Sequence, residues 1–225
     1  QGFTFDNWIN WDAVLGLREA VVTSLQVGLL ATVVATVLGT LIALAIVRHR
    51  FAGRSTTNLL VFLPISTPEI VLGASLLTLF LNTTAIFQLG FWTIFIAHVM
   101  FIMSFIVVTV KARLISFDRH LEEAAMDLGA NELTTFRKVT LPLIAPAMLA
   151  AALLGFALSI DDFVITYFNA GGTQTFPIFV WGIARVSVPP QVNVVASAIF
   201  LVAIALALGN VLWQYRSAKR TQGAT

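Results

Sequence analysis

The stretch SFDRHLEEAAMDLGANELTTFRKVTL (residues 116–141) is rich in polar, helix-favouring residues and is flanked by two long apolar segments. Residues 70–110 contain no Asp, Glu, Lys or Arg, and neither do residues 139–160. A helix needs about 20 mostly apolar residues to cross a bilayer. We therefore predict that the stretch is an extramembrane loop between two membrane spans and that the fold is all-α.

The composition of the 225 residues indicates a membrane protein. Hydrophobic residues make up 58% of the chain and charged residues only 11%, whereas soluble domains carry about 25% charged residues. These values exclude a soluble enzyme and a disordered chain, and a net charge of +2 is too small to indicate a nucleic-acid partner. The chain has no cysteine, which excludes disulfides, zinc–thiolate sites and thiol catalysis.

Charge-free apolar segments predict five spans in a single membrane domain, residues 1–225. The spans are placed at about 21–47, 59–81, 91–113, 142–168 and 192–215. Turn residues at 82–84 and 88–90 separate the second span from the third. The segment 173–190 is also apolar, but its prolines would break a full crossing. We predict a short helix or a re-entrant piece there.

The distribution of Lys and Arg predicts the orientation. These residues cluster after the first span, between the third and fourth spans, and after the last span, and only Arg18 and Arg185 fall on the other side. Because basic loops face the cytoplasm, we expect a cytoplasmic C-terminus. Residues 1–17 then lie outside the cytoplasm, which predicts a sixth span missing before residue 1, with a cleaved signal sequence as the alternative.

The polar stretch is expected to form two short helices on the cytoplasmic side. Asp118 suits the N-cap of the first helix, and Gly129 suits its C-terminal end. Asn131 is expected to cap the second helix, and Pro142 to start the fourth span. The small residues Ala124, Ala125 and Gly129 would let the surface of another protein approach closely.

A longer pattern in this stretch is similar to a known motif. The pattern resembles the EAA motif of ABC importer permeases, EAA-x3-G-x9-I-x-L-P. It consists of Glu123-Ala124-Ala125, three further residues, Gly129, nine further residues and VTLP at 139–142, with Val where the family usually has Ile. The resemblance implies that this loop docks in a groove of an ATPase subunit, with Glu123 pairing with basic groups and Gly129 making the bend.

The resemblance extends over nearly the whole chain. The chain is similar to the PotC-type permeases of spermidine/putrescine ABC importers in the segments PISTPEIVLGASLL, EEAAMDLGA and ALSIDDFVITYF. This resemblance implies a MetI-like fold of six spans in a bacterial inner membrane. The partners that it implies are a PotB-type permease, two ATPase subunits, an extracytoplasmic binding protein and membrane lipid. The chain has no GxxxxGK[ST] loop. We therefore expect no enzymatic activity and no cofactor in this chain, with ATP and Mg held by the partner ATPase.

Ionisable residues inside a membrane indicate a functional site. Asp161, Asp162 and Glu69 lie in predicted spans, and Phe163 and Tyr167 accompany the two aspartates. Carboxylates beside aromatic rings can hold an alkyl ammonium by ion pairing and cation–π contact, so we assign these five residues to the substrate path.

Other roles stay open for the same acids and for the single histidine of the third span. The aspartates could cap a broken helix or pair with Arg185, and Glu69 could satisfy backbone groups freed by neighbouring prolines. His98 is expected to be hydrogen-bonded packing. The three histidines of the chain lack metal-ligand spacing, and no metal site is expected.

The sequence features distinguish four candidate functions. A permease for polyamines accounts for the loop and for the acids, and a permease for another small solute accounts for the loop. An ion-coupled secondary transporter would leave the EAA pattern unexplained. An intramembrane aspartyl protease would need facing carboxylates from different helices, whereas Asp161 and Asp162 are adjacent on one.

Overall fold

The computed structural model describes residues 5–83 and 86–222, with side chains described to residue 211, and its regular elements are all helices. They are α1 (Asp6–Ile9), α2 (Leu17–Arg48), α3 (Arg54–Ser66), α4 (Glu69–Asn82), α5 (Phe91–Ser116), α6 (His120–Asp127), α7 (Glu132–Thr135), the π-helical turn η1 (Phe136–Thr140), α8 (Leu141–Asp161), α9 (Val164–Asn169), α10 (Phe176–Ala184) and α11 (Pro190–Gln222). The all-α prediction is confirmed.

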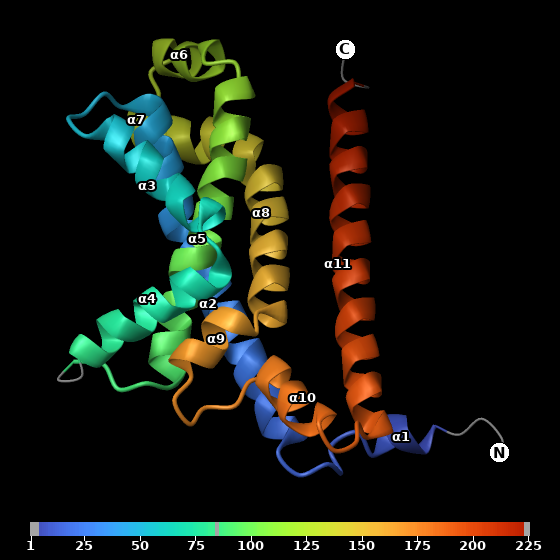
Figure 1. The fold of residues 1–225 in the computed structure, drawn as a ribbon. Helices are drawn as coiled ribbons and strands as arrows, with labels where there is room; N and C mark the ends of the chain where they lie inside the picture. Colours follow the sequence, from blue (N-terminus) through green and yellow to red (C-terminus); the bar gives the residue numbers. More distant parts are fainter. Residues whose placement is uncertain (1–4, 84–85, 223–225) are drawn as a thin grey trace.

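Within the described residues, four long helical stretches are apolar enough to cross a membrane, namely α2, α5, α11 and the run from α7 to α8. The bent pair of α3 and α4 brings the number to five if it forms one span. In Figure 1, α8 and α11 run in roughly one direction whereas α4 lies across them, and α6 is at one end of the bundle with α1, α9 and α10 at the other. The loop that holds α6 is therefore on the side opposite to α1.

The core of the bundle is formed where α2, α5 and α8 pack together. Small residues of α2 allow this contact, because a Cβ atom at Gly39 would lie only 2.9 Å from Cγ2 of Ile106. Ile102 and Ile106 of α5 are fully buried there. Helices in lipid associate through such close packing rather than through a hydrophobic driving force. The three helices thus form the frame that positions the shorter elements.

The second predicted span, 59–81, is not continuous. α3 ends at Ser66, α4 begins at Glu69, and their axes differ by 112°. Pro68 has no N–H group, and proline disfavours a helical conformation at the residue before it. The Thr67 hydroxyl donates to the carbonyl of Leu63 (2.6 Å) at this break. Glu69 therefore lies in the first turn of α4, at the break between the two halves of the predicted span.

The fourth predicted span, 142–168, also differs from the structure at both ends. It breaks after Asp161, and α9 begins at Val164. At its start, no separate second helix precedes it in the described residues, because α7, η1 and α8 follow one another without a gap from Glu132. Pro142 cannot donate a hydrogen bond to the preceding turn, and the π-helical turn lies immediately before it.

α4 and α9, which follow the two breaks, pack against each other. A Cβ atom at Gly73 of α4 would lie 2.9 Å from Cδ2 of Phe168. Asn169 Nδ2 donates to the carbonyl of Gly73 (3.4 Å) and to that of Ile165 (2.8 Å). The two short helices therefore form one packed unit beside the frame.

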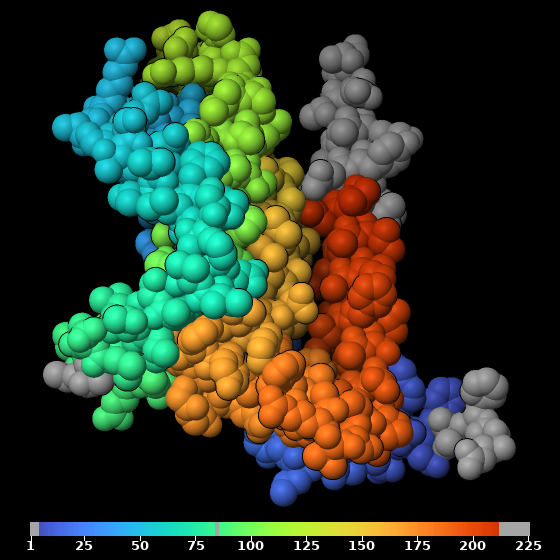
Figure 2. Space-filling model, in the orientation of Figure 1, coloured from blue at the N-terminus to red at the C-terminus, as the bar shows by residue number. Residues whose placement is uncertain are grey.

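The remaining predicted segments are close to the observed helices. α2, α5 and α11 correspond to the first, third and fifth spans, and the segment 173–190 contains the short helix α10. The predicted turn at 82–84 includes Thr83, the C-cap of α4, whereas Thr84 lies outside the described residues. In Figure 2, α11 forms a ridge beside the surface of α8.

Candidate transport site and coupling loop

Asp162 is buried at the break between α8 and α9 and stabilises the start of α9. The residue is only 8% exposed. Its carboxylate accepts hydrogen bonds from the backbone N–H groups of Ile165 (3.3 Å) and Thr166 (2.8 Å). The Thr166 hydroxyl donates to the same carboxylate (2.7 Å). Of the roles left open for the aspartates, the structure therefore places Asp162 as a helix cap.

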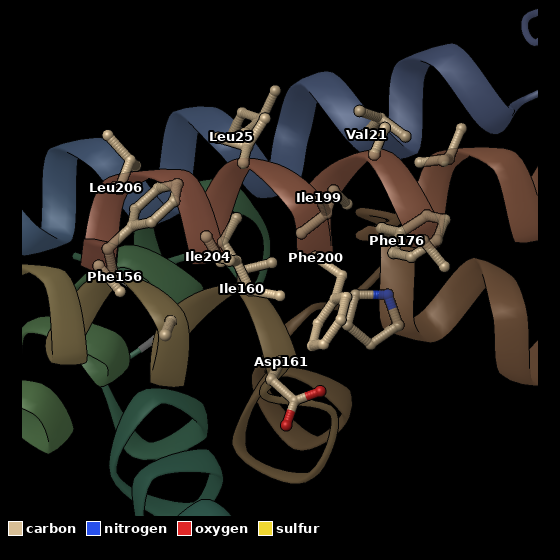
Figure 3. Close-up of a pocket in the computed structure, with 18 of the residues that line it drawn as sticks. Val21, Leu25, Phe156, Ile160, Asp161, Phe176, Ile199, Phe200, Ile204 and Leu206 are labelled. Atoms are coloured by element: carbon tan, nitrogen blue, oxygen red, sulfur yellow. The ribbon is translucent and has the colours of Figure 1, made fainter. Parts of the chain in front are cut away.

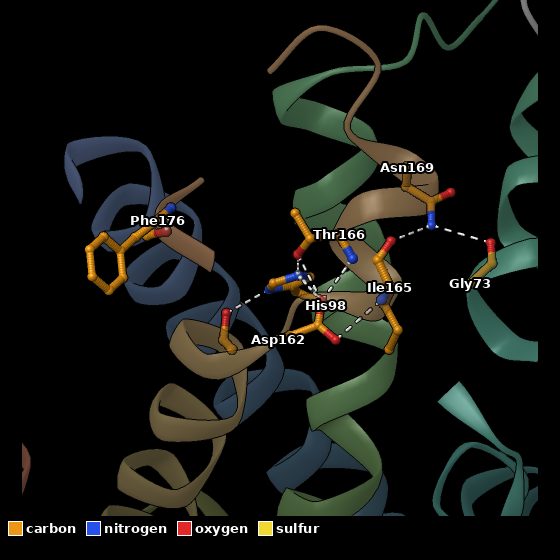
Figure 4. Close-up of polar contacts among 9 residues, drawn as sticks. Gly73, His98, Asp162, Ile165, Thr166, Asn169 and Phe176 are labelled. Carbon is orange, nitrogen blue, oxygen red and sulfur yellow. Dashed lines mark hydrogen bonds and ion pairs between the residues drawn. The ribbon is translucent and has the colours of Figure 1, made fainter. Parts of the chain in front are cut away.

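His98 of α5 joins this group (Figure 4). Its Nε2 lies 3.3 Å from Oδ2 of Asp162 and 2.8 Å from the Thr166 hydroxyl, and its Nδ1 lies 2.7 Å from the Ser159 hydroxyl. The histidine is only 2% exposed. The prediction of hydrogen-bonded packing for His98 is confirmed. One buried polar network thus connects α5, α8 and α9 in an otherwise apolar interior.

Asp161 faces a different environment from its neighbour. It is the last residue of α8 and is exposed, and it lines an apolar cavity of about 1510 Å³ between α8, α10 and α11. Among the described residues that line the cavity, Asp161 alone is charged. In Figure 3 its carboxylate lies at the edge of the cavity and points away from the apolar side chains. A cation near this edge would therefore meet one carboxylate.

Aromatic rings lie close together beside Asp161. The ring of Phe163 is 5.3 Å from that of Tyr167 and 5.2 Å from that of Trp181, between centroids. The guanidinium of Arg185 lies 5.3 Å from the Trp181 ring. Within the described part of the chain, no ion pair joins Arg185 to either aspartate, so the predicted alternative of such a pair is not observed.

The predicted path residues are thus only partly brought together. Asp161, Phe163 and Tyr167 lie at one place, whereas Asp162 is buried in its network and Glu69 is exposed in the first turn of α4, outside the residues that line the cavity. Sequence reasoning missed Trp181, which carries no distinguishing signal in the apolar segment of α10. Only the packing of α10 against α8 brings its ring to Phe163.

Helix α6, in the loop with the EAA pattern, ends just before Gly129 as predicted. Gly129 has φ +87°, and its N–H donates to the carbonyl of Met126 (2.9 Å), while the N–H of Ala130 donates to that of Ala125 (3.1 Å). These two bonds form a Schellman motif, for which glycine is the preferred residue. Asn131 Oδ1 accepts the N–H of Thr134 (2.8 Å), so its predicted cap is also confirmed.

The start of α6 differs by one residue from the prediction. Arg119 occupies the N-cap position, and Asp118 Oδ1 accepts the N–H of His120 (3.0 Å) and contacts its Nδ1 (2.7 Å). The backbone and side-chain hydrogen bonds from His120 lower the pKa of Asp118. The hydrogen bond to Asp118 raises the pKa of His120. Protonated His120 is thus favoured at the exposed start of the loop.

The two glutamates at the start of α6 have different surroundings. The Glu123 side chain is 53% exposed, with Arg119 Nε 3.8 Å away on the same helix. The Glu122 side chain is 12% exposed and contacts Arg48 of α2. Ala124 and Gly129 are exposed and Ala125 is half-buried. Nothing in the local sequence indicates this contact, because Arg48 lies 74 residues away along the chain.

No metal centre is formed by the described residues. No group of three or more His, Asp or Glu side chains in that part of the chain could hold a metal ion. The groups that could contact a solute are the Asp161 carboxylate in the cavity lining and, in the buried network, the side chains of Asp162 and His98.

Long apolar helices, a helix break beside a buried polar network and a polar loop at one end characterise this membrane domain. Residues 22–221 match the family described as the inner membrane component of binding-protein-dependent transport systems. The chain belongs to this family. It is a multi-pass protein of the inner membrane and a transport component.

Curated relatives agree with this family. The chain is 36% identical over 217 residues to the spermidine/putrescine transport system permease protein PotC of Escherichia coli K12, covering 94% of this chain and 80% of PotC. It is 38% identical over 203 residues to the putrescine transport system permease protein PotI of the same strain, covering 88% and 72%. The resemblance to PotC-type permeases is confirmed.

A solved structure shows the same fold. A crystal structure of an amino acid ABC transporter with histidines has a TM-score of 0.69 at 15% identity, covering 96% of this chain and 100% of that one. The prediction of an ABC importer permease fold is therefore confirmed.

Proposed function

We propose that this chain is the permease subunit of an ATP-driven importer and forms half of the membrane path for the polyamines spermidine and putrescine. The observation that carries the proposal is the similarity to PotC and PotI over most of the chain. Asp161 beside the rings of Phe163, Tyr167 and Trp181 supports it, because a carboxylate and aromatic faces together bind alkyl ammonium groups.

The proposed machine contains three kinds of partner protein besides this chain. A PotB-type permease completes the path, two ATPase subunits hydrolyse ATP, one of them docked on the α6 loop, and an extracytoplasmic binding protein delivers the cargo. ATP and Mg bind to the ATPase, since this chain has no phosphate-binding loop. Residues 1–225 act as one membrane domain in a bacterial inner membrane, and another small solute is the alternative cargo.

The test of cargo uses the complete complex in lipid vesicles. ATP-driven uptake of labelled spermidine is expected, with competition by putrescine and none by an uncharged solute of similar size. If the uncharged solute competes as well as putrescine, a different cargo is indicated.

Asp161→Asn is expected to lower spermidine uptake about tenfold. At 4 Å an ion pair is worth roughly 4 kcal/mol at an effective dielectric of 20, and desolvation removes much of this. A remaining 1.4 kcal/mol corresponds to about tenfold. Asn keeps the size of the side chain, and Asp161 is exposed, so folding should not change. Initial uptake rates in vesicles measure the effect.

Asp12→Asn is the matched control, because Asp12 is also exposed and lies outside the cavity lining. It should transport at the wild-type rate. Equal rates for Asp161→Asn and the wild type would remove Asp161 from the proposed path.

The proposed orientation has α6 and the C-terminus in the cytoplasm and α1 outside. The chain has no cysteine, so Leu15→Cys and Leu128→Cys can each be labelled separately. Both positions are exposed, at 97% and 90%. A membrane-impermeant thiol reagent on intact spheroplasts is expected to label residue 15 and to spare residue 128, and permeabilised cells should show both. Labelling of residue 128 alone in intact spheroplasts would reverse the topology.

A further inference from the structure

Glu122 has contacts that docking on an ATPase does not explain. Its neighbour Glu123 is mostly exposed, whereas the Glu122 side chain is 12% exposed and turned towards the membrane helices. A carboxylate removed from solvent in this way is costly unless it is paired. Its partners therefore indicate what it does.

Glu122 joins three elements through one oxygen atom. Oε1 accepts a hydrogen bond from Arg48 Nη2 (3.1 Å) at the end of α2 and from the Thr140 hydroxyl (2.6 Å) at the end of η1. Arg48 is itself held, because its guanidinium lies 5.4 Å from the ring centroid of Phe117. Its side chain is only 15% exposed. The charge-assisted contact is thus shielded from solvent on both sides.

The backbone route from α6 to α8 is less direct than this contact. It passes through the bend at Gly129 and then through η1, whose π-helical hydrogen bonding precedes Pro142. π-helical turns next to α-helices occur frequently at functional sites. A displacement of α6 along the backbone would be absorbed partly at Gly129. The side chain of Glu122 bypasses that bend and reaches α2 and η1 directly.

We propose that Glu122 is a positioning residue that transmits displacement of α6 to α2 and, through η1, to α8. The proposal rests on the proposed function, in which an ATPase subunit docks on the α6 loop and drives import. It assigns the two glutamates of the loop separate tasks: Glu123 contacts the ATPase, and Glu122 passes the movement to the frame of the membrane domain.

The experiment measures spermidine uptake and ATP hydrolysis together in the complete complex in vesicles. Glu122→Ala and Arg48→Met each remove the contact from one side, and each is expected to lower the uptake per ATP hydrolysed at least fivefold. The double variant should be no worse than the poorer single variant, because both remove the same interaction. Arg48→Lys keeps the charge and should retain at least half of the wild-type ratio.

Glu19→Ala and Arg50→Met are the matched controls, since both residues are exposed, lie outside the α6 loop and do not contact Glu122. They should leave the ratio unchanged. If Glu122→Ala reduces the yield of folded complex, Glu122→Gln, which keeps the shape but not the charge, replaces it.

Three results would overturn the role of Glu122: an unchanged ratio, multiplicative effects in the double variant, or loss of ATPase subunits during purification. Absence of ATP-driven spermidine uptake in the wild type would instead contradict the proposed cargo. In that case, the role of Glu122 is tested by measuring how strongly the binding protein stimulates ATP hydrolysis by the complex. Stimulation should fall at least fivefold in Glu122→Ala, and unchanged stimulation overturns its role.

Discussion

Asp162→Ala is expected to destabilise the membrane domain by about 3–5 kcal/mol, the usual cost of removing one partner from a buried charged network. The backbone N–H groups of Ile165 and Thr166 would lose their acceptor, and His98 would lose a partner in an apolar interior. Because whole domains are stable by only about 5–15 kcal/mol, much of the protein should fail to fold. The yield of monodisperse protein and its thermal unfolding midpoint measure this.

The adjacent aspartate provides an internal comparison for this prediction. Asp161→Asn should unfold at the wild-type temperature and lose uptake, whereas Asp162→Ala should lose folded protein. Thr166→Ser keeps the hydroxyl that donates to Asp162 and should behave as the wild type. A wild-type unfolding midpoint for Asp162→Ala would show that the network does not hold α9 in place.

Glu123→Lys is expected to abolish transport while leaving the membrane domain folded. The side chain is 53% exposed, with a neighbour only on its own helix, so its replacement disturbs little inside the protein. On a surface that meets basic groups of an ATPase, reversal of charge replaces attraction with repulsion, and like charges brought together cost several kcal/mol. ATPase subunits should no longer co-purify, and ATP-driven uptake should fall below detection.

Glu19→Lys makes the same charge change at an exposed position outside the α6 loop and controls for net charge alone. It should retain both co-purification and uptake. Retention of ATPase subunits and transport in Glu123→Lys would remove this glutamate from the docking surface and leave the EAA pattern without its proposed role.

Local chemistry explains what could be predicted from the sequence. The Schellman motif at Gly129 and the cap at Asn131 need only residues within one or two helical turns, and both are observed. The spans follow from the length of charge-free segments. The bounds of α2, α5 and α11 were therefore predicted approximately, whereas the breaks after Ser66 and Asp161 inside two predicted spans were not.

Contacts between distant segments explain what could not be predicted. Asp161 and Asp162 are indistinguishable as neighbouring acids, and only the position of His98 on another helix assigns the second one to a buried network. The roles of Glu122 and Glu123 depend in the same way on which side of α6 faces Arg48. Pro142 lies at the start of α8 as predicted, but the sequence did not indicate that the helical run would already begin at Glu132.

The packed unit of α4 and α9 has a geometric consequence. It is held together by the contacts of Gly73 with Phe168 and Asn169. It is also bonded to α5 of the frame, because the Thr93 hydroxyl donates to the carbonyl of Asn169 (2.7 Å) and His98 contacts the Thr166 hydroxyl (2.8 Å). A displacement of α5 would therefore carry α9, and with it α4, in the same direction.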